Sequence, residues 1–141
     1  MNNENNAKTM RNFHNFVKST LLCETNVEVR KTKTKTHLLD IGVGRGGDLN
    51  KWIKAEVDVV IGIDSNISYI EDAKKRLLGN RLKKPNSIYK FYYCSKDNTI
   101  EESLERIKCS FKFDIVSCQF ALHYFLSSEE QFDMYMKNIT N

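Results

Sequence analysis

Proline, glycine and metal-binding patterns are all scarce in this chain. Of 141 residues, one is proline and six are glycine, which excludes collagen-like, proline-rich and low-complexity architectures. The four cysteines (Cys23, Cys94, Cys109 and Cys118) form no C-x-x-C pair, and no C-x-x-H completes a zinc site. No apolar run approaches the roughly 20 residues of a membrane-spanning helix, and the polar N-terminus lacks the apolar region of a secretory signal. We therefore expect one intracellular domain with reduced cysteines, no metal site and no membrane contact.

Apolar residues and basic charge are present in useful amounts. Hydrophobic residues make up 40% of the chain and aromatic residues 11%, which is enough for a packed core. The net charge is +4, and residues 8–54 alone hold ten basic and four acidic side chains. A basic surface of this kind attracts phosphates. A solvated face explains the same charge equally simply, so charge alone does not choose between them.

Helical and strand patterns alternate regularly along the chain. Their spacing predicts helices over 11–30, 48–55, 65–80, 99–108 and 127–139, and strands over 37–43, 57–64, 88–94 and 113–120. Ser65 or Asn66 and, further on, Thr99 are placed to cap helices. Residues 1–9 read as a disordered polar tail and residues 31–36 as a solvated linker. The alternation predicts an α/β fold, with a parallel sheet covered by helices on both faces.

A glycine-rich turn follows the first predicted strand. The segment LLDIGVGRGGD holds Asp40, Gly42 and Gly44, and Asp64 ends the next strand 20 residues after Gly44. A strand, a glycine cluster and a helix in this order let backbone approach a ligand closely, and a carboxylate at the second strand tip accepts hydrogen bonds from ribose hydroxyls. Dinucleotide binders usually carry G-x-G-x-x-G. The crowded glycines here therefore favour a nucleoside cofactor other than NAD.

Three separated motifs carry a family resemblance. RNFHNFVKSTL (11–21), LLDIGVGRGGDLNKW (38–52) and FDIVSCQFALHY (113–124) together resemble the eukaryotic and viral mRNA cap guanine-N7 methyltransferases, which are class I S-adenosylmethionine-dependent methyltransferases. The resemblance implies a Rossmann-like fold that has seven strands when complete. With about four strands, residues 10–141 are expected to be the N-terminal portion of such a domain, truncated before its fifth strand. We then expect an exposed sheet edge after the fourth strand and weak or absent activity from this chain alone.

The resemblance also implies a cofactor site. Lys18 matches the lysine that contacts the methionine part of S-adenosylmethionine, Gly42 approaches the cofactor through its backbone, and Asp64 holds the ribose. Gln119 and Tyr124 match positions that wall the cofactor and methyl-transfer pocket.

The adenine site departs from the family pattern. The family usually places an acidic residue just after the third strand, whereas this chain reads Ser95-Lys96-Asp97. Either a short loop shift lets Asp97 serve, or Ser95 and backbone hold the adenine alone. We favour Asp97.

Capped RNA is the implied substrate. The positions that match cap-binding ones are His14, Asn15, Arg45, Asp48 and His123. Arg45 is the natural ligand of the triphosphate, because a guanidinium is a fork-shaped donor to phosphate oxygens.

The implied reaction moves a methyl group from S-adenosylmethionine to N7 of the cap guanine. That nitrogen has a lone pair and no proton to lose, so no catalytic base is expected, and positioning and electrostatics would suffice. Other capping-enzyme domains or subunits are expected partners. The expected location is the nucleus for a cellular protein and the host cytoplasm for a viral one. Two alternatives stay open: another class I methyltransferase, acting on RNA or a small molecule, and a non-catalytic cofactor-binding fragment.

Overall fold

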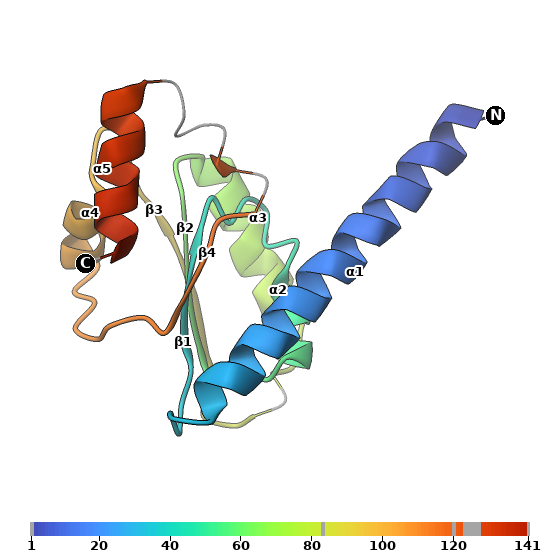
Figure 1. Ribbon diagram of the computed structural model, residues 1–141, viewed down its shortest axis with the longest axis horizontal. Coiled ribbons are helices and arrows are strands. Elements are labelled where there is room, and N and C mark those ends of the chain that lie inside the picture. The colour runs from blue at the N-terminus through green and yellow to red at the C-terminus, as the bar shows by residue number, and fades with distance from the viewer. Residues whose placement is uncertain (1, 83, 120, 123–127, 141) are drawn as a thin grey trace.

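A single parallel sheet forms the centre of the molecule. The structure, a computed structural model, describes residues 2–82, 84–119, 121–122 and 128–140. Its four strands lie in the order β3-β2-β1-β4, and all pairs are parallel (Figure 1). The strands are β1 (His37–Ile41), β2 (Val59–Asp64), β3 (Ile88–Tyr93) and β4 (Ile115–Ser117). The predicted α/β fold with a parallel sheet is confirmed.

The two central strands are buried along most of their length. β1 and β2 are apolar nearly throughout, as strands covered on both faces must be. β4 is shorter than the predicted 113–120, because only three of its residues pair with β1. Val116 in this edge strand is 40% exposed, so the outer side of β4 lacks the cover that the central strands have.

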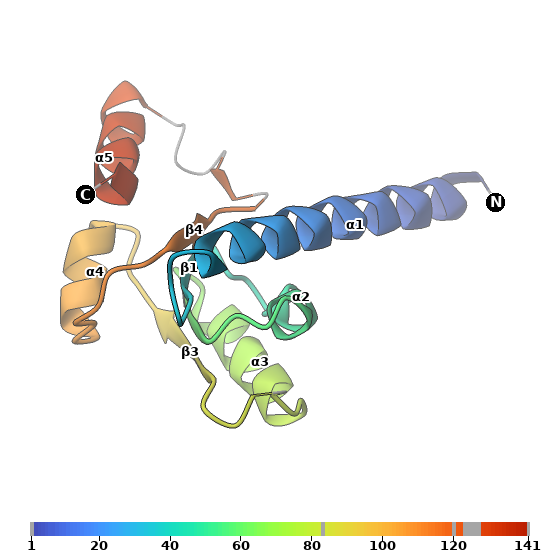
Figure 2. The ribbon, with the colours of Figure 1, turned by 60° about the horizontal axis from the view of Figure 1, so that its bottom comes forward.

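Helices cover both faces of the sheet (Figure 2). The first face carries α1 (Asn2–Arg30), α2 (Leu49–Lys54) and α3 (Ile67–Leu78), and the second carries α4 (Ile100–Arg106) and α5 (Glu129–Thr140). Two apolar clusters result. One gathers around Leu38, Trp52 and Val60 beneath α1–α3, and the other around Ile61 and Ile100 beneath α4. The sheet therefore separates two cores, and its strand tips are left for a site.

Helix starts follow the side chains that the sequence offers as caps. Asn66 caps α3, because its side chain accepts a hydrogen bond from the backbone N–H of Tyr69. Thr99 and Glu102 form a reciprocal capping box at the start of α4. Both predicted caps are confirmed.

The first helix is longer than its apolar pattern predicts. α1 begins at Asn2, so the segment expected to be a polar tail continues the helix, and the helix projects past the sheet (Figure 1). The side chains of residues 4–13 are all exposed. Tertiary packing therefore does not fix this end of the helix, and whether residues 1–9 are ordered in solution stays a prediction. No helix in the described part of the chain is long and apolar enough to cross a membrane.

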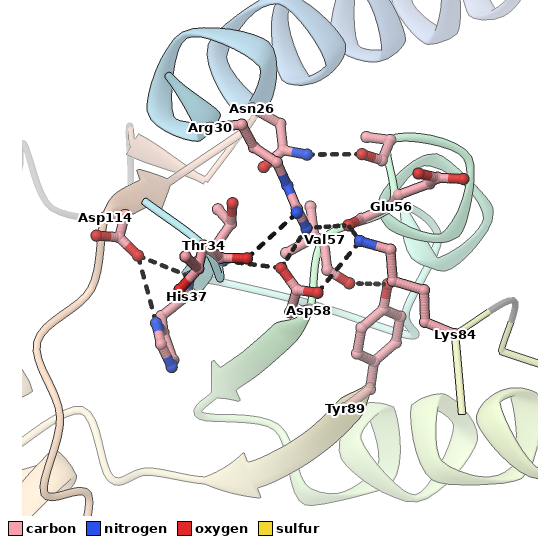
Figure 3. A network of polar contacts seen from close by, with 12 residues as sticks. Asn26, Arg30, Thr34, His37, Glu56, Val57, Asp58, Lys84, Tyr89 and Asp114 are labelled. Carbon is pink, nitrogen blue, oxygen red and sulfur yellow. Dashed lines mark hydrogen bonds and ion pairs between the residues drawn. The ribbon is translucent and has the colours of Figure 1, made fainter. Parts of the chain in front are cut away.

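A polar network closes the amino-terminal edge of the sheet (Figure 3). Asp58, just before β2, accepts a hydrogen bond from the backbone N–H of Thr36 at 2.8 Å and pairs with Arg30 and Lys84. Asn26 in α1 donates to the carbonyl oxygen of Ala55 at 2.7 Å. The network fastens the C-terminal end of α1 to the edge opposite the strand tips that carry the site.

Candidate functional site

A cleft of about 650 Å³ opens at the carboxyl ends of the strands. This is the edge at which open parallel sheets bind ligands, and the volume lies in the range of roughly 300–1,000 Å³ typical of small-molecule sites. The strand tips contribute the floor of the cleft, and α4 and α5 contribute Ile100, Ser103 and Tyr135 to its wall. The fold thus provides a ligand-sized space beside the glycine turn.

Gly42 lets the turn fold back over the second strand. Its φ is +75°, and a Cβ at this position would lie 2.5 Å from the Cβ of Ala121, so no other residue fits without a shift. The backbone N–H groups of Gly42 and Val43 both donate to the carbonyl oxygen of Ile63, at 2.9 and 3.1 Å. The turn is therefore fixed to the tip of β2, and Gly42 lines the cleft.

Asp64 is held in place by two backbone donors. The N–H of Gly44 donates to Oδ2 at 2.8 Å, and the N–H of Asn66 donates to Oδ1 at 2.8 Å. A carboxylate has about four acceptor positions, so these bonds leave capacity for ligand hydroxyls. Asp64 lines the cleft, and the glycine turn and the strand tip thus build one acceptor together.

The remaining predicted cofactor residues divide between cleft and surface. Gln119 and Ser95 line the cleft, whereas Asp97 is exposed and is not among the lining residues. The Asp97 carboxylate instead accepts a hydrogen bond from the Ser95 hydroxyl at 3.3 Å. Tyr124 lies outside the described residues. Of the two residues predicted for the adenine, only Ser95 lines the cleft.

Lys18 and Asp48, predicted for different ligands, pair directly with each other. Lys18 Nζ lies 3.1 Å from Asp48 Oδ2, and Lys51 Nζ lies 2.9 Å from Asp48 Oδ1. Asp48 occupies the N-cap position of α2 but makes no side-chain cap hydrogen bond. Lys18 is not among the residues that line the cleft. The pair links α1 to the glycine turn.

Asp40 is a buried acid that was not among the predicted site residues. It is 4% exposed at the end of β1. Burial raises its pKa to about 8, with a further increase from the nearby charge of Asp48, while a hydrogen bond with Ser117 and the charge of Lys18 oppose the rise. Its sequence signal is an acid that ends an apolar strand just before the glycines.

Two guanidinium groups lie beside the glycine turn. Arg45 Nη1 lies 2.7 Å from Asp72 Oδ2, and the guanidinium sits 4.7 Å from the ring centroid of Tyr69, with the side chain 59% exposed. Arg76 in α3 donates from Nη1 to the carbonyl oxygen of Gly46 at 3.3 Å. Arg76 belongs to no sequence motif, so only the packing of α3 against the turn reveals it.

The other predicted cap residues lie in part outside the described chain. His14 and Asn15 lie on α1 about one turn before Lys18, and His123 is outside the described residues. No group of three or more His, Cys, Asp or Glu side chains among the described residues could hold a metal ion.

The amino-acid sequence matches a known protein family. Residues 2–141 match the model of the mRNA (guanine-N(7))-methyltransferase domain. The chain belongs to the mRNA (guanine-N(7))-methyltransferase domain family. Relatives include the mRNA cap guanine-N(7) methyltransferase of Caenorhabditis elegans, 37% identical over 133 residues, and that of Drosophila melanogaster, 35% identical over 137 residues. A probable mRNA-capping enzyme of Acanthamoeba polyphaga mimivirus is 31% identical over 160 residues.

The chain spans only part of the length of its relatives in this family. The matches cover 92% of this chain but 34% of the nematode protein, 92% but 32% of the fly protein, and 99% but 13% of the viral one. The activities and substrates in those names therefore belong to proteins about three times as long or longer.

Solved structures confirm the Rossmann-like methyltransferase fold. CalS10, an amino pentose methyltransferase from Micromonospora echinaspora solved with S-adenosylmethionine, superposes with a TM-score of 0.61 at 17% identity, covering 86% of this chain and 43% of CalS10. A methyltransferase from Methanosarcina mazei gives a TM-score of 0.56 at 21% identity, covering 76% of this chain and 47% of that one.

Proposed function

We propose that this chain supplies the cofactor-binding part of an mRNA cap guanine-N7 methyltransferase that uses S-adenosylmethionine. The observation that carries the proposal is the carboxylate of Asp64, held by the glycine turn at the mouth of a cleft of about 650 Å³. Family membership supplies the substrate class, because the matched relatives are named as cap methyltransferases and a probable capping enzyme.

The residues of the cleft fit S-adenosylmethionine. Asp64 would accept the ribose hydroxyls, and the backbone at Gly42 would contact the cofactor closely. Ser95 would face the adenine, and Gln119 would wall the cofactor and methyl-transfer pocket. Tyr124 and Asp97 stay as predicted contacts, with Asp97 acting through the hydroxyl of Ser95. When bound, the cofactor supplies an electrophilic methyl group on a sulfonium.

Charges at the end of β1 suit the amino-acid part of the cofactor. Lys18, already predicted to contact it, carries its ammonium beside Asp48, and both charges act on the buried Asp40. Asp40, largely protonated without a ligand, would attract the cofactor's ammonium once it gives up its proton, and Lys18 would attract the carboxylate. Because Asp48 shares its charge between two lysines, it fixes Lys18 without removing all of its positive potential.

The cap triphosphate would lie along the outer side of the glycine turn. Arg45 and Arg76 present two guanidinium groups there, and both are fork-shaped phosphate donors. His14, Asn15, Asp48 and His123 stay as predicted contacts to the cap. Guanine N7 needs no base, so these residues would act by positioning N7 against the methyl group.

Partners and location follow the relatives. The viral relative, named as a probable capping enzyme, is far longer than this chain, which supports association with other capping domains. The relatives include animal and viral proteins, so the nuclear and the host-cytoplasmic locations both stand.

Cofactor binding tests the proposal through Asp64. We expect Asp64→Ala to weaken S-adenosylmethionine binding by at least about tenfold in titration calorimetry, because two charge-assisted hydrogen bonds would be lost. Asp64→Asn keeps an acceptor oxygen for one backbone donor, so its affinity for S-adenosylmethionine should lie between those of the unmodified chain and Asp64→Ala. Asp133→Ala, which removes an exposed carboxylate of α5, is the matched control.

Methyl transfer then separates the alternatives. With radiolabelled cofactor, transfer to capped but not to uncapped RNA would support the cap reaction. Cofactor binding without transfer is the result expected of a truncated domain and of a non-catalytic fragment alike, whereas equal transfer to both RNAs would favour another methyltransferase. Unchanged calorimetry for Asp64→Ala would contradict the cofactor site itself.

A further inference from the structure

The basic side chains of α1 fall into two groups. From Lys18 to the end of the helix they are paired: Lys18 with Asp48 at 3.1 Å, and Arg30 with Asp58. Lys8 and Arg11 are exposed, and neither makes an ion pair or side-chain hydrogen bond with any described residue. The paired cations fasten the helix to the body, whereas the outer two serve no internal contact.

Helical spacing places the outer cations in line with the site. Residues 8, 11, 15 and 18 follow one another at intervals of three, four and three, so they share one face of the helix. We call Lys8, Arg11 and Asn15 the outer α1 stripe. Lys18, next on this face, contacts Asp48 in the glycine turn. The stripe therefore leads directly away from the proposed cap site.

The dimensions of the stripe fit a polymer rather than a single group. At about 1.5 Å per residue, Arg11 lies about 10 Å and Lys8 about 15 Å along the axis from Lys18. This part of α1 projects past the sheet, so its whole length is accessible (Figure 1). Glu4, one turn further out on the same face, ends the run of positive charge.

The chemistry of the stripe favours nucleic acid over protein. Lys, Arg and Asn are side chains that donate to phosphate and sugar oxygens. No apolar residue interrupts this face between positions 8 and 18, since the exposed Phe13 and Phe16 lie on the other side of the helix. An apolar partner would find its contacts on that opposite side.

We propose that the outer α1 stripe binds the sugar-phosphate backbone of the nucleotides that follow the cap. The proposal rests on the proposed function, which places the cap triphosphate at the glycine turn. RNA leaving that turn would run outward along α1, with Arg11 and then Lys8 neutralising successive phosphates. The contacts are to the backbone alone, so binding along the stripe is independent of RNA sequence.

Fluorescence anisotropy on the Lys8→Ala/Arg11→Ala double variant tests the stripe. The ligands are the cap dinucleotide GpppA, a capped RNA decamer and the same decamer uncapped, each titrated over a range of salt. Two lost phosphate contacts should weaken decamer binding about 25-fold at 0.1 M salt and reduce the salt slope by about 1.4. GpppA affinity should stay unchanged. Lys31→Ala/Lys35→Ala, which removes the same charge from the segment that follows α1, is the matched control.

The outcomes separate the stripe from the proposed function. Equal decamer binding by the double variant and the unmodified chain, or equal losses in the control, would overturn the stripe. Failure of the unmodified chain to bind either decamer would also overturn it and favour a protein partner for α1. Equal affinity for capped and uncapped decamers, with the loss in the double variant still present, would contradict the cap site and leave the stripe supported.

Discussion

Single acidic residues behave differently at the two ends of the strands. Asp58, at the amino-terminal edge, is partly buried, but the N–H of Thr36 and the cations of Lys84 and Arg30 outweigh that burial and lower its pKa. Asp40, at the carboxyl edge, is fully buried beside further acids, and its pKa rises to about 8. A carboxyl group with that pKa is largely protonated at neutral pH, so the site edge retains an acid that can change charge when a ligand arrives.

Asp40 should make stability decrease as pH rises. Its folded pKa of about 8 exceeds the unfolded value of 3.8, so the folded state holds an extra proton between these values. Stability therefore falls over that window, by up to about 1.4 kcal/mol per pH unit. Asp40→Asn, which is neutral at all pH values, should remove this fall. Urea denaturation of both proteins from pH 5 to 8 measures it, and parallel profiles would contradict the expectation.

At the scale of elements, short helices depend on their caps. α4 has only seven residues, and its first turn supplies Ile100 and Ser103 to the wall of the cleft. Isolated helices of this length are unstable in water. The capping box formed by Thr99 and Glu102 therefore helps to hold a wall of the site, not merely a surface helix.

Thr99→Ala should destabilise the protein by about 1 kcal/mol, because the N–H of Glu102 loses its acceptor. Glu102→Ala, which removes the reciprocal bond to the N–H of Thr99, should cost somewhat less. Chemical denaturation gives both values. Ser110→Ala, at an exposed position after α4, is the control, and a loss there as large as for Thr99→Ala would contradict the role of the box.

At the scale of the whole molecule, a polar network fastens one edge of the sheet, and the cleft opens at the other. Asp58 joins α1 through Arg30, the start of β1 through Thr36, and the segment before β3 through Lys84. These three parts of the chain are distant in sequence but meet at one carboxylate (Figure 3). At the opposite edge, the strand tips carry the glycine turn, whose left-handed backbone conformations glycine adopts without strain.

Asp58→Ala should destabilise the chain by about 2 kcal/mol, because loss of the partly buried carboxylate leaves two cations and one N–H without their acceptor. With a lowered folded pKa, the Asp58 contribution is present above the unfolded value of 3.8 and is lost as pH falls through the lower folded value. Asp58→Asn should therefore lack this part of acid denaturation. Glu28→Ala removes the exposed pair with Lys31 and should cost less than about 0.5 kcal/mol in the same urea titration.

Local patterns predicted the elements that depend on local physics. The buried runs of β1 and β2, the caps at Asn66 and Thr99 and the glycine turn all follow from side-chain type and spacing, and the structure confirms them. The predicted length of β4 was too great, because an apolar run indicates burial but not how many of its residues pair with a neighbouring strand.

Contacts between distant residues were harder to predict. The pairing of Lys18 with Asp48 joins residues 30 positions apart, and Arg76 reaches Gly46 across the same distance. Neither contact leaves a periodic signal in the sequence. The position of Asp97 depends on the exact path of a loop. Ser95 and Asp97 are only two residues apart, yet Ser95 lines the cleft and Asp97 does not.

In its proposed role, Asp64 would also decide which ribose-bearing molecules the cleft accepts. Its carboxylate is fixed by the N–H groups of Gly44 and Asn66 before any ligand enters, so it does not turn away from an unsuitable one. A sugar with two hydroxyls offers donors to this acceptor, whereas a phosphate on the same sugar would bring negative charge against negative charge. With the role proposed for Asp64, the cleft would select unphosphorylated ribose and reject 2′-phosphorylated nucleotides by electrostatic repulsion.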